Sequence, residues 1–139
     1  NFNTFIIDSR EEYLNMTNNK NINYLLSIEP WKIVNTLKDN AYYVVLTHSH
    51  DYDLKILNEI LYKKFKFVGL IGSSTKRKRF FKRLIDNGHN KDTVEKIECP
   101  LGIDIGNSKD PTEIALSIIT RLISLKNSKA EQKKIKVAS

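Results

Sequence analysis

Short apolar runs alternate with stretches in which apolar residues recur every three or four positions along most of the 139-residue chain. The runs have the length and the β-branched or aromatic content of strands, whereas the recurring pattern is that of amphipathic helices. Strands are therefore predicted at residues 2–7, 24–28, 42–47 and 65–71, and helices at 31–38, 54–64, 74–87, 90–96 and 110–126.

The alternation of strands and helices predicts βα units, and hence an α/β fold with a mostly parallel sheet and helices on its faces. The continuous apolar run at 42–47 is typical of a central strand that is covered on both sides. Ligands of such sheets collect outside the carboxyl ends of the strands. Polar or glycine-bearing segments follow these ends at 8–10, 47–53, 72–76 and 99–106, so we expect one crevice to gather all four.

Residues that favour helix ends mark several of these boundaries. Gly88 is expected to end the helix at 74–87, because glycine readily adopts the left-handed conformation that closes a helix. The strongest start signal is Asp110 as N-cap, followed by Pro111 at the first helical position and Glu113 at the third.

The length and composition favour one globular domain. Hydrophobic residues make up 40% of the chain and charged residues 28%, close to the values of folded domains. We assign this domain to residues 1–126 and a basic, disordered tail to residues 127–139. The formal net charge of +7 suits a phosphorylated or polyanionic partner, although the abundance of Asn, Lys and Ile also fits a compositional bias of the source.

Cysteine content and the length of the apolar runs indicate a cytoplasmic setting. Cys99 is the only cysteine, which excludes an intrachain disulfide, a four-cysteine zinc site and an iron–sulfur ligand set. The longest apolar runs fall well short of the roughly 20 residues that span a bilayer, and no signal peptide is visible. We therefore expect a cytoplasmic protein that does not enter a membrane.

The stretch at 65–83 combines an apolar strand, a glycine turn and a helix that starts with a basic run. A helix N-terminus already carries partial positive charge, so placing the four cations at 76–79 (Lys76, Arg77, Lys78 and Arg79) there is unfavourable unless an anion lies nearby. The turn is neither a P-loop nor a dinucleotide fingerprint, but its residues Gly72, Ser73, Ser74 and Thr75 can offer N–H and hydroxyl donors. An anion site is one interpretation, and a tight turn before a solvated basic helix face is an equally good one.

The segment that follows residue 47 is the candidate metal site. His48, His50 and Asp53 resemble the HxHxDH ligand run of metallo-β-lactamase-type hydrolases, but that run requires Asp at position 52 and His at position 53, where this chain has Tyr52 and Asp53. We therefore assign no metal ligand. We favour Asp51 or Asp53 as a helix N-cap, with both histidines as polar residues of the crevice.

Asp8 ends the first predicted strand, where dinucleotide-binding folds place the acid that binds the ribose hydroxyls. That scheme needs a glycine-rich turn about 20 residues upstream, and the sequence has none there. A pair with Arg10, or the capping of a turn, explains Asp8 at least as well.

Four segments in this order resemble the C-terminal domain of the xanthine dehydrogenase accessory proteins, the XdhC/CoxI family. They are LTHSHDYDLKILNEIL, FVGLIGSSTKRKRFFKRL, CPLGIDIG and DPTEIALSII, and the resemblance covers about residues 2–126. It implies a Rossmann-like three-layer sandwich and an accessory factor that binds the molybdenum cofactor and assists its sulfurated form into xanthine dehydrogenase. The family domain usually opens with a further strand and a Gly-x-Gly-His turn. No such unit precedes Asp8, so we keep N-terminal truncation as an interpretation.

The resemblance implies cofactor-binding roles for Thr47, His48 and Asp53, for the turn at Gly69, Gly72 and Ser73, and for the Pro-x-Gly-x-Asp-x-Gly segment. Three positions depart from the family pattern, namely Ser49, Ser74 and Arg121. Together with the candidates from local chemistry, the predicted cofactor-binding residues are Asp8, Thr47, His48, Asp53, Gly72, Ser73, Ser74, Lys76, Arg77, Pro100, Gly102, Asp104 and Gly106.

The leading hypothesis is a cofactor chaperone rather than a catalyst. Its implied partners are a xanthine dehydrogenase-type molybdoenzyme, a cysteine desulfurase and a second copy of the chain in a homodimer.

One alternative is an NAD-dependent oxidoreductase or metallohydrolase that uses His48, His50 and Asp53, with NAD the weaker ligand because the glycine turn is missing. Another is a degenerate family member without cofactor binding. Nucleic acid is not expected as a partner, because the basic helix lacks interleaved exposed aromatic residues.

Overall fold

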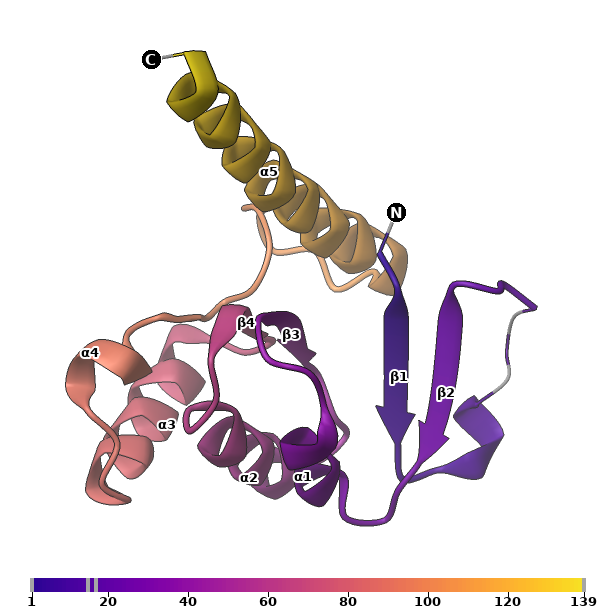
Figure 1. Ribbon diagram of the computed structural model, residues 1–139. Coiled ribbons are helices and arrows are strands. Elements are labelled where there is room, and N and C mark those ends of the chain that lie inside the picture. Colours follow the sequence, from indigo (N-terminus) through magenta and orange to yellow (C-terminus); the bar gives the residue numbers. More distant parts are fainter. Residues whose placement is uncertain (1, 15, 17, 139) are drawn as a thin grey trace. The chain divides into compact units, whose positions relative to one another are not determined.

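The computed structural model describes residues 2–14, 16 and 18–138, and it describes side chains as far as Ser128. The chain forms two compact units, Asn1–Cys99 and Pro100–Ser139 (Figure 1). The first unit carries all of the strands described below and the first four α-helices. The second carries a loop and one long helix.

The strands and helices alternate along the first unit, as the sequence pattern predicts. The strands are β1 (Thr4–Asp8), β2 (Ile22–Leu26), β3 (Ala41–Val45), β4 (Phe65–Leu70) and β5 (Ile97–Glu98). The α-helices are α1 (Pro30–Ile33), α2 (His50–Ile60), α3 (Ser74–Asp86), α4 (Lys91–Val94) and α5 (Pro111–Ala138). Two 3₁₀ turns, η1 (Glu11–Tyr13) and η2 (Val34–Thr36), complete the set.

The strands form two parallel sheets, one with the order β1-β2 and one with the order β3-β4-β5. The α/β class is confirmed, but the strand predicted at 42–47 is not central. It corresponds to β3, which lies at one edge of the three-stranded sheet, and β4 is the middle strand. The prediction was wrong because Tyr42 and Val44 are only half-buried, whereas the last four residues of β4 are buried.

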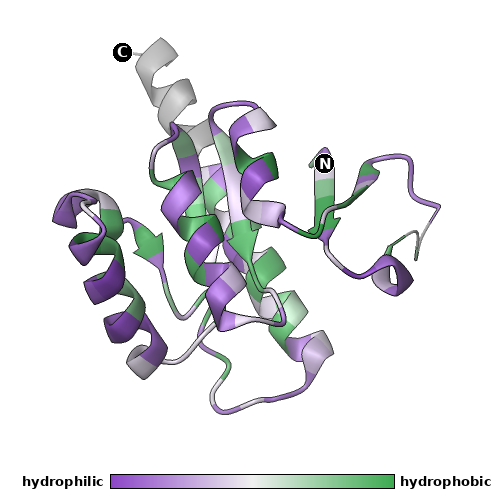
Figure 2. Cartoon of the chain, turned by 90° about the horizontal axis from the view of Figure 1, so that it is seen from below, coloured by the Kyte–Doolittle hydropathy of each residue, from purple (hydrophilic) through white to green (hydrophobic). Residues whose placement is uncertain are grey.

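The core of the first unit lies between the three-stranded sheet and helices α2 and α3. Leu57 and Ile60 of α2 and Leu84 of α3 are fully buried with Val68 and Leu70 of β4. Figure 2 shows the underlying pattern, with hydrophobic residues along the strands and helices that carry both hydrophobic and hydrophilic stripes. Burial of these apolar faces fixes helices α2 and α3 beside the ends of β3 and β4.

Helix ends follow the cap signals with one exception. Asp110 accepts a hydrogen bond from Thr112 N at 2.8 Å at the start of α5, and Gly88, at φ 101°, follows the end of α3. The N-cap of α2 is Ser49, whose Oγ accepts from Tyr52 N at 3.3 Å. The prediction of Asp51 or Asp53 as this cap was wrong, because the helix begins earlier than its apolar pattern indicates.

Three helices differ clearly in length from the prediction, and one of them is α4 (Lys91–Val94), which is shorter than the helix expected at 90–96. The helix expected at 31–38 is split into α1 and the 3₁₀ turn η2, and α5 continues past residue 126 to Ala138. The division into a domain over 1–126 and a tail over 127–139 stays a prediction. In the part of the chain that the structure describes, no helix is long and apolar enough to cross a membrane.

Candidate functional site

The first unit contains a hollow of about 570 Å³ at the carboxyl ends of β3 and β4, beside the first turns of α2 and α3. This is the edge at which parallel sheets bind ligands. The residues that line the hollow come from the two strand-to-helix loops and the two helices; they are Leu46, Thr47, His48, His50, Asp53, Ile71, Gly72, Ser73, Thr75, Lys76 and Arg79.

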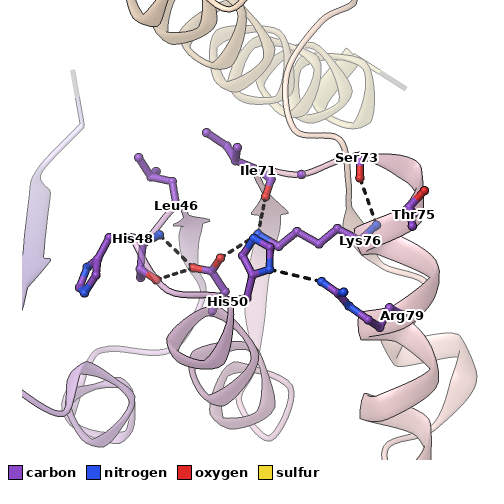
Figure 3. A pocket seen from close by; sticks show the side chains of 11 residues that line it. Leu46, His48, His50, Ile71, Ser73, Thr75, Lys76 and Arg79 are labelled. Atoms are coloured by element: carbon purple, nitrogen blue, oxygen red, sulfur yellow. Dashed lines mark hydrogen bonds and ion pairs between the residues drawn. The ribbon is translucent and has the colours of Figure 1, made fainter.

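An ion pair between Asp53 and Lys76 forms the buried wall of this hollow. Lys76 Nζ lies 2.8 Å from Asp53 Oδ2 and donates a second hydrogen bond to the carbonyl oxygen of Ile71 at 2.9 Å. The other carboxylate oxygen, Oδ1, accepts from both the backbone N–H and the hydroxyl of Thr47, at 2.9 and 2.8 Å. The pair therefore joins the loop after β3 to the loop after β4, as the dashed lines in Figure 3 show.

Gly72 is required by the path of the Lys76 side chain. A Cβ built on Gly72 would lie 2.5 Å from Lys76 Cδ, well inside van der Waals contact. The methylene chain of Lys76 thus runs directly over the glycine backbone to reach Asp53. Behind the same turn, Cys99 Sγ lies 3.7 Å from the carbonyl oxygen of Gly72, and burial raises the pKa of this thiol.

Exposed polar groups surround the mouth of the hollow. Arg79 Nη2 lies 3.3 Å from His50 Nδ1, so the imidazole nitrogen accepts from the guanidinium when the ring is neutral (Figure 3). Ser73 is the N-cap of α3, its Oγ accepting from Lys76 N at 3.2 Å. Thr75 is exposed in the first turn of the same helix.

Aromatic rings continue from the hollow along α2. The ring of His48 meets the ring of Tyr52 edge-on, with the two centroids 5.4 Å apart, and Tyr52 meets Trp31 in the same manner at 5.1 Å. Lys55 Nζ lies 4.6 Å from the centroid of the Trp31 ring. His48 is therefore an exposed ring supported on one side by a partly buried aromatic cluster.

Asp8 lies in the other sheet, at the end of β1, and does not line the hollow. Arg10 donates to both of its carboxylate oxygens, from Nε to Oδ1 and from Nη2 to Oδ2, each at 3.0 Å. These bonds hold the pKa of Asp8 below its usual value. The expectation that one crevice gathers the ends of all the strands is therefore wrong for Asp8.

The Pro-x-Gly-x-Asp-x-Gly segment belongs to the second unit, where its residues have local structural roles. Gly102 and Gly106 adopt positive φ angles of 105° and 73°. Asp104 Oδ1 accepts from Gly106 N at 2.8 Å, and a side chain on Gly102 would meet the hydroxyl of Ser117. Pro100 is exposed. A ligand role for this segment stays a prediction.

Of the residues predicted from the sequence, the structure brings one group together. The hollow is lined by Thr47, His48, Asp53, Gly72, Ser73 and Lys76. Ser74 and Arg77 lie on α3 but do not line it. The set predicted for the cofactor omitted five lining residues, which are Leu46, His50, Ile71, Thr75 and Arg79. Arg79 belongs to the basic run noted at 76–79 and could have been included in the set, because it lies three residues after Lys76 and so faces the same side of the helix.

The geometry does not assemble the metal site considered for the loop after β3. Asp53 is 1% exposed, and Lys76 and Thr47 already occupy its two oxygens. Among the described residues, no three His, Cys, Asp or Glu side chains converge as metal ligands do.

Comparison with known proteins identifies the fold family. The family model described as the XdhC Rossmann domain matches residues 1–122. The chain belongs to the XdhC Rossmann-domain family. The recognition made from the four sequence segments is thereby confirmed, as is the Rossmann-like α/β fold.

Individual relatives of this XdhC domain are longer proteins. A probable xanthine dehydrogenase subunit of Bacillus subtilis (strain 168) is 30% identical over 80 residues, which is 58% of this chain and 22% of that protein. The uncharacterized protein YqeB of Escherichia coli (strain K12) is 26% identical over 83 residues, 60% of this chain and 15% of that protein. The chain thus spans less than a quarter of the length of these two relatives.

A crystal structure of a xanthine dehydrogenase from Bacillus halodurans has the same fold. It superposes with a TM-score of 0.77 at 22% sequence identity, over 95% of this chain and 39% of that chain. At this identity the likeness shows the fold alone.

Proposed function

We propose that this XdhC-type chain binds the molybdenum cofactor as cargo and assists its sulfuration or its insertion into a xanthine dehydrogenase-type enzyme. The observation that carries the proposal is that a family match over residues 1–122 coincides with a hollow at the strand ends, where Rossmann folds bind their ligands. The Bacillus subtilis relative, named as a probable component of xanthine dehydrogenase, supports the choice of partner.

The residues of the hollow suit the chemistry of this cargo. A pyranopterin cofactor combines a flat polar ring system with a phosphate, and a volume of about 570 Å³ falls within the usual range of small-molecule sites. Arg79, Ser73 and Thr75 supply positive charge and donors for the phosphate end. The exposed side chains of Leu46 and His48 supply an apolar and an aromatic surface for the ring end.

The partners of the chain are proposed from the same family match. The molybdoenzyme would receive the cofactor, a cysteine desulfurase would supply the sulfur, and a cytoplasmic homodimer would carry out the transfer. NAD and a catalytic metal are not part of this proposal. Asp53, the carboxylate that the enzyme hypotheses require, is neutralised by Lys76 and is not available to a ligand.

Retention of the cofactor on a desalting column tests the proposal. The cofactor, released anaerobically from a molybdoenzyme, is mixed with the chain, and the pterin that elutes with the protein is measured by its fluorescence after oxidation. We expect the wild type to retain the cofactor and Leu46→Glu to lose it, because the new carboxylate stands at the mouth of the hollow. Tyr62→Glu is the matched control, since Tyr62 is 69% exposed and lies outside the hollow.

Two results would overturn the proposal. If the wild type elutes without pterin, the chain is a family member that does not bind the cofactor. If Leu46→Glu and Tyr62→Glu retain equal amounts, any binding occurs away from the hollow.

A further inference from the structure

The basic start of α3 contains four consecutive cations, and the structure gives them different surroundings. Lys76 is buried and paired with Asp53. The guanidinium of Arg77 lies 4.3 Å from the centroid of the Phe81 ring, outside the hollow. Lys78 is exposed and also lies outside it, whereas Arg79 is exposed and lines it. The cation positioned to meet a ligand is therefore Arg79, not Lys76 or Arg77.

Arg79 has an unusual partner for a surface arginine. Its Nη2 lies 3.3 Å from His50 Nδ1, and no carboxylate of the described residues lies within ion-pair distance of its guanidinium. A neutral imidazole accepts one hydrogen bond without cancelling the positive charge. The contact thus orients the guanidinium between α2 and α3 and leaves its charge for another group.

The other charges near the hollow do not compensate Arg79. Asp53 is the only carboxylate among the lining residues, and Lys76 already neutralises it. Asp51, the next carboxylate on α2, is paired with Lys55 at 2.9 Å. The mouth of the hollow therefore carries a net positive charge that faces solvent.

We propose that Arg79, oriented by His50, is the residue that binds the anionic end of the ligand, and that this end is a phosphate or pyrophosphate group. The planar guanidinium fork matches two phosphate oxygens at once, which a lysine ammonium does not. This assignment deepens the proposed function, because the phosphate of the cofactor cargo is the group that Arg79 would hold.

Titration calorimetry with inorganic pyrophosphate, at constant ionic strength, tests the assignment on the whole chain. We expect Arg79→Ala to weaken binding about tenfold or more, as the loss of a charge-assisted hydrogen bond does. Arg79→Lys should recover part of the affinity, because it keeps the charge without the fork. His50→Ala should weaken binding less than Arg79→Ala, because it removes only the group that orients the guanidinium.

Lys78→Ala is the matched control, because it removes one positive charge from the same helix, one residue away and outside the hollow. If Lys78→Ala weakens pyrophosphate binding as much as Arg79→Ala does, the attraction is a property of the whole basic helix and the assignment is wrong. It is also wrong if the wild type does not bind pyrophosphate. Urea unfolding of Arg79→Ala should match that of the wild type, which separates a lost contact from a lost fold.

The two proposals fail in different ways. Pyrophosphate binding that depends on Arg79, without retention of the cofactor, would remove the proposed function and leave the phosphate site. If both the wild type and Arg79→Ala retain the cofactor, the proposed function stands and the assignment of Arg79 as the phosphate-binding residue is wrong.

Discussion

Two carboxylates near the carboxyl ends of strands in the first unit are each paired with a cation, and the two pairs are built differently. At the end of β1, Asp8 pairs with Arg10, two residues away, and 21% and 35% of the two side chains are exposed. Beyond the end of β3, Asp53 pairs with Lys76, which lies 23 residues further along the chain. These two side chains are 1% and 10% exposed.

Sequence separation and burial decide what such a pair can do. The Asp8–Arg10 pair fixes only the turn that contains it, and solvent screens its attraction. The Asp53–Lys76 pair links two strand-to-helix loops and so shapes the hollow between them. Water cannot solvate a buried charge whose partner is removed, so breaking this pair should be costly.

The largest expected effect comes from Lys76→Met. This variant keeps most of the length of the side chain, which is one atom shorter, but leaves Asp53 as a buried carboxylate without its cation. We expect it to lower the free energy of unfolding by about 3–5 kcal/mol, as is typical when one partner of a buried pair is removed. Urea denaturation followed by circular dichroism measures the loss.

The double variant Asp53→Asn/Lys76→Met sharpens this prediction. The amide keeps an acceptor for Thr47 but carries no charge, so the double variant should be more stable than Lys76→Met alone. Lys78→Met is the control for removing a charge from α3, and it should change stability little. If Lys76→Met and Lys78→Met lower the free energy of unfolding equally, the buried pair does not contribute more to stability than an exposed charge on the same helix.

The next effect in size is that of Gly72→Ala. The new Cβ would lie 2.5 Å from Lys76 Cδ, and the ends of that side chain are fixed by the helix and by Asp53. We expect a loss of about 1–3 kcal/mol, the usual cost of overpacking. In a double-mutant cycle the loss should shrink in a Lys76→Ala background, which provides space for the methyl group. Additive losses would indicate that the clash is with something other than Lys76.

The order of the elements and most helix ends could be predicted from the sequence, because both depend on neighbouring residues. The apolar spacing of Leu54, Leu57 and Leu61 marks α2, and the side chain of Asp110 caps α5 within its own first turn. The start of α2 was misplaced because Ser49 and the two aspartates that follow it are all good N-caps, and the choice depends on backbone geometry.

The Asp53–Lys76 contact could not be predicted in the same way. Local reasoning finds Lys76 at the positive end of a helix and offers a nearby anion as one of two interpretations. In the structure a negative charge does lie beside Lys76, but it is the chain's own Asp53, brought there by the pairing of β3 with β4. A contact across 23 residues depends on tertiary structure. The position of β3 in the sheet also depends on tertiary structure. Its run of apolar residues resembles that of a central strand, but β3 lies at the edge of the three-stranded sheet.

A smaller effect is expected from the N-cap of α3. Ser73 Oγ accepts from the backbone N–H of Lys76, so the cap also holds the first turn from which the buried lysine projects. Ser73→Ala should cost about 1 kcal/mol of stability, the typical value for a lost cap. Ser49→Ala, which removes the corresponding cap of α2, is the matched comparison by urea unfolding. A cost far above that of Ser49→Ala would mean that Ser73 supports the ion pair as well as the helix.

The smallest effect, and the one that completes the comparison, is that of Arg10→Ala. The pKa of Asp8 is lowered by the two side-chain bonds from Arg10, so this variant should raise it toward its usual value, which an NMR titration of the Asp8 carboxyl group measures. A carboxylate whose pKa is lower in the folded state stabilises the fold above its unfolded pKa of about 3.9 and loses that contribution as the pH falls through the folded value. The wild type should therefore exceed Arg10→Ala slightly in stability at neutral pH, and the two should converge in acid.

An unchanged pKa of Asp8 would mean that the pair does not persist in solution, whereas a loss at neutral pH as large as that of Lys76→Met would remove the distinction between the two strand ends.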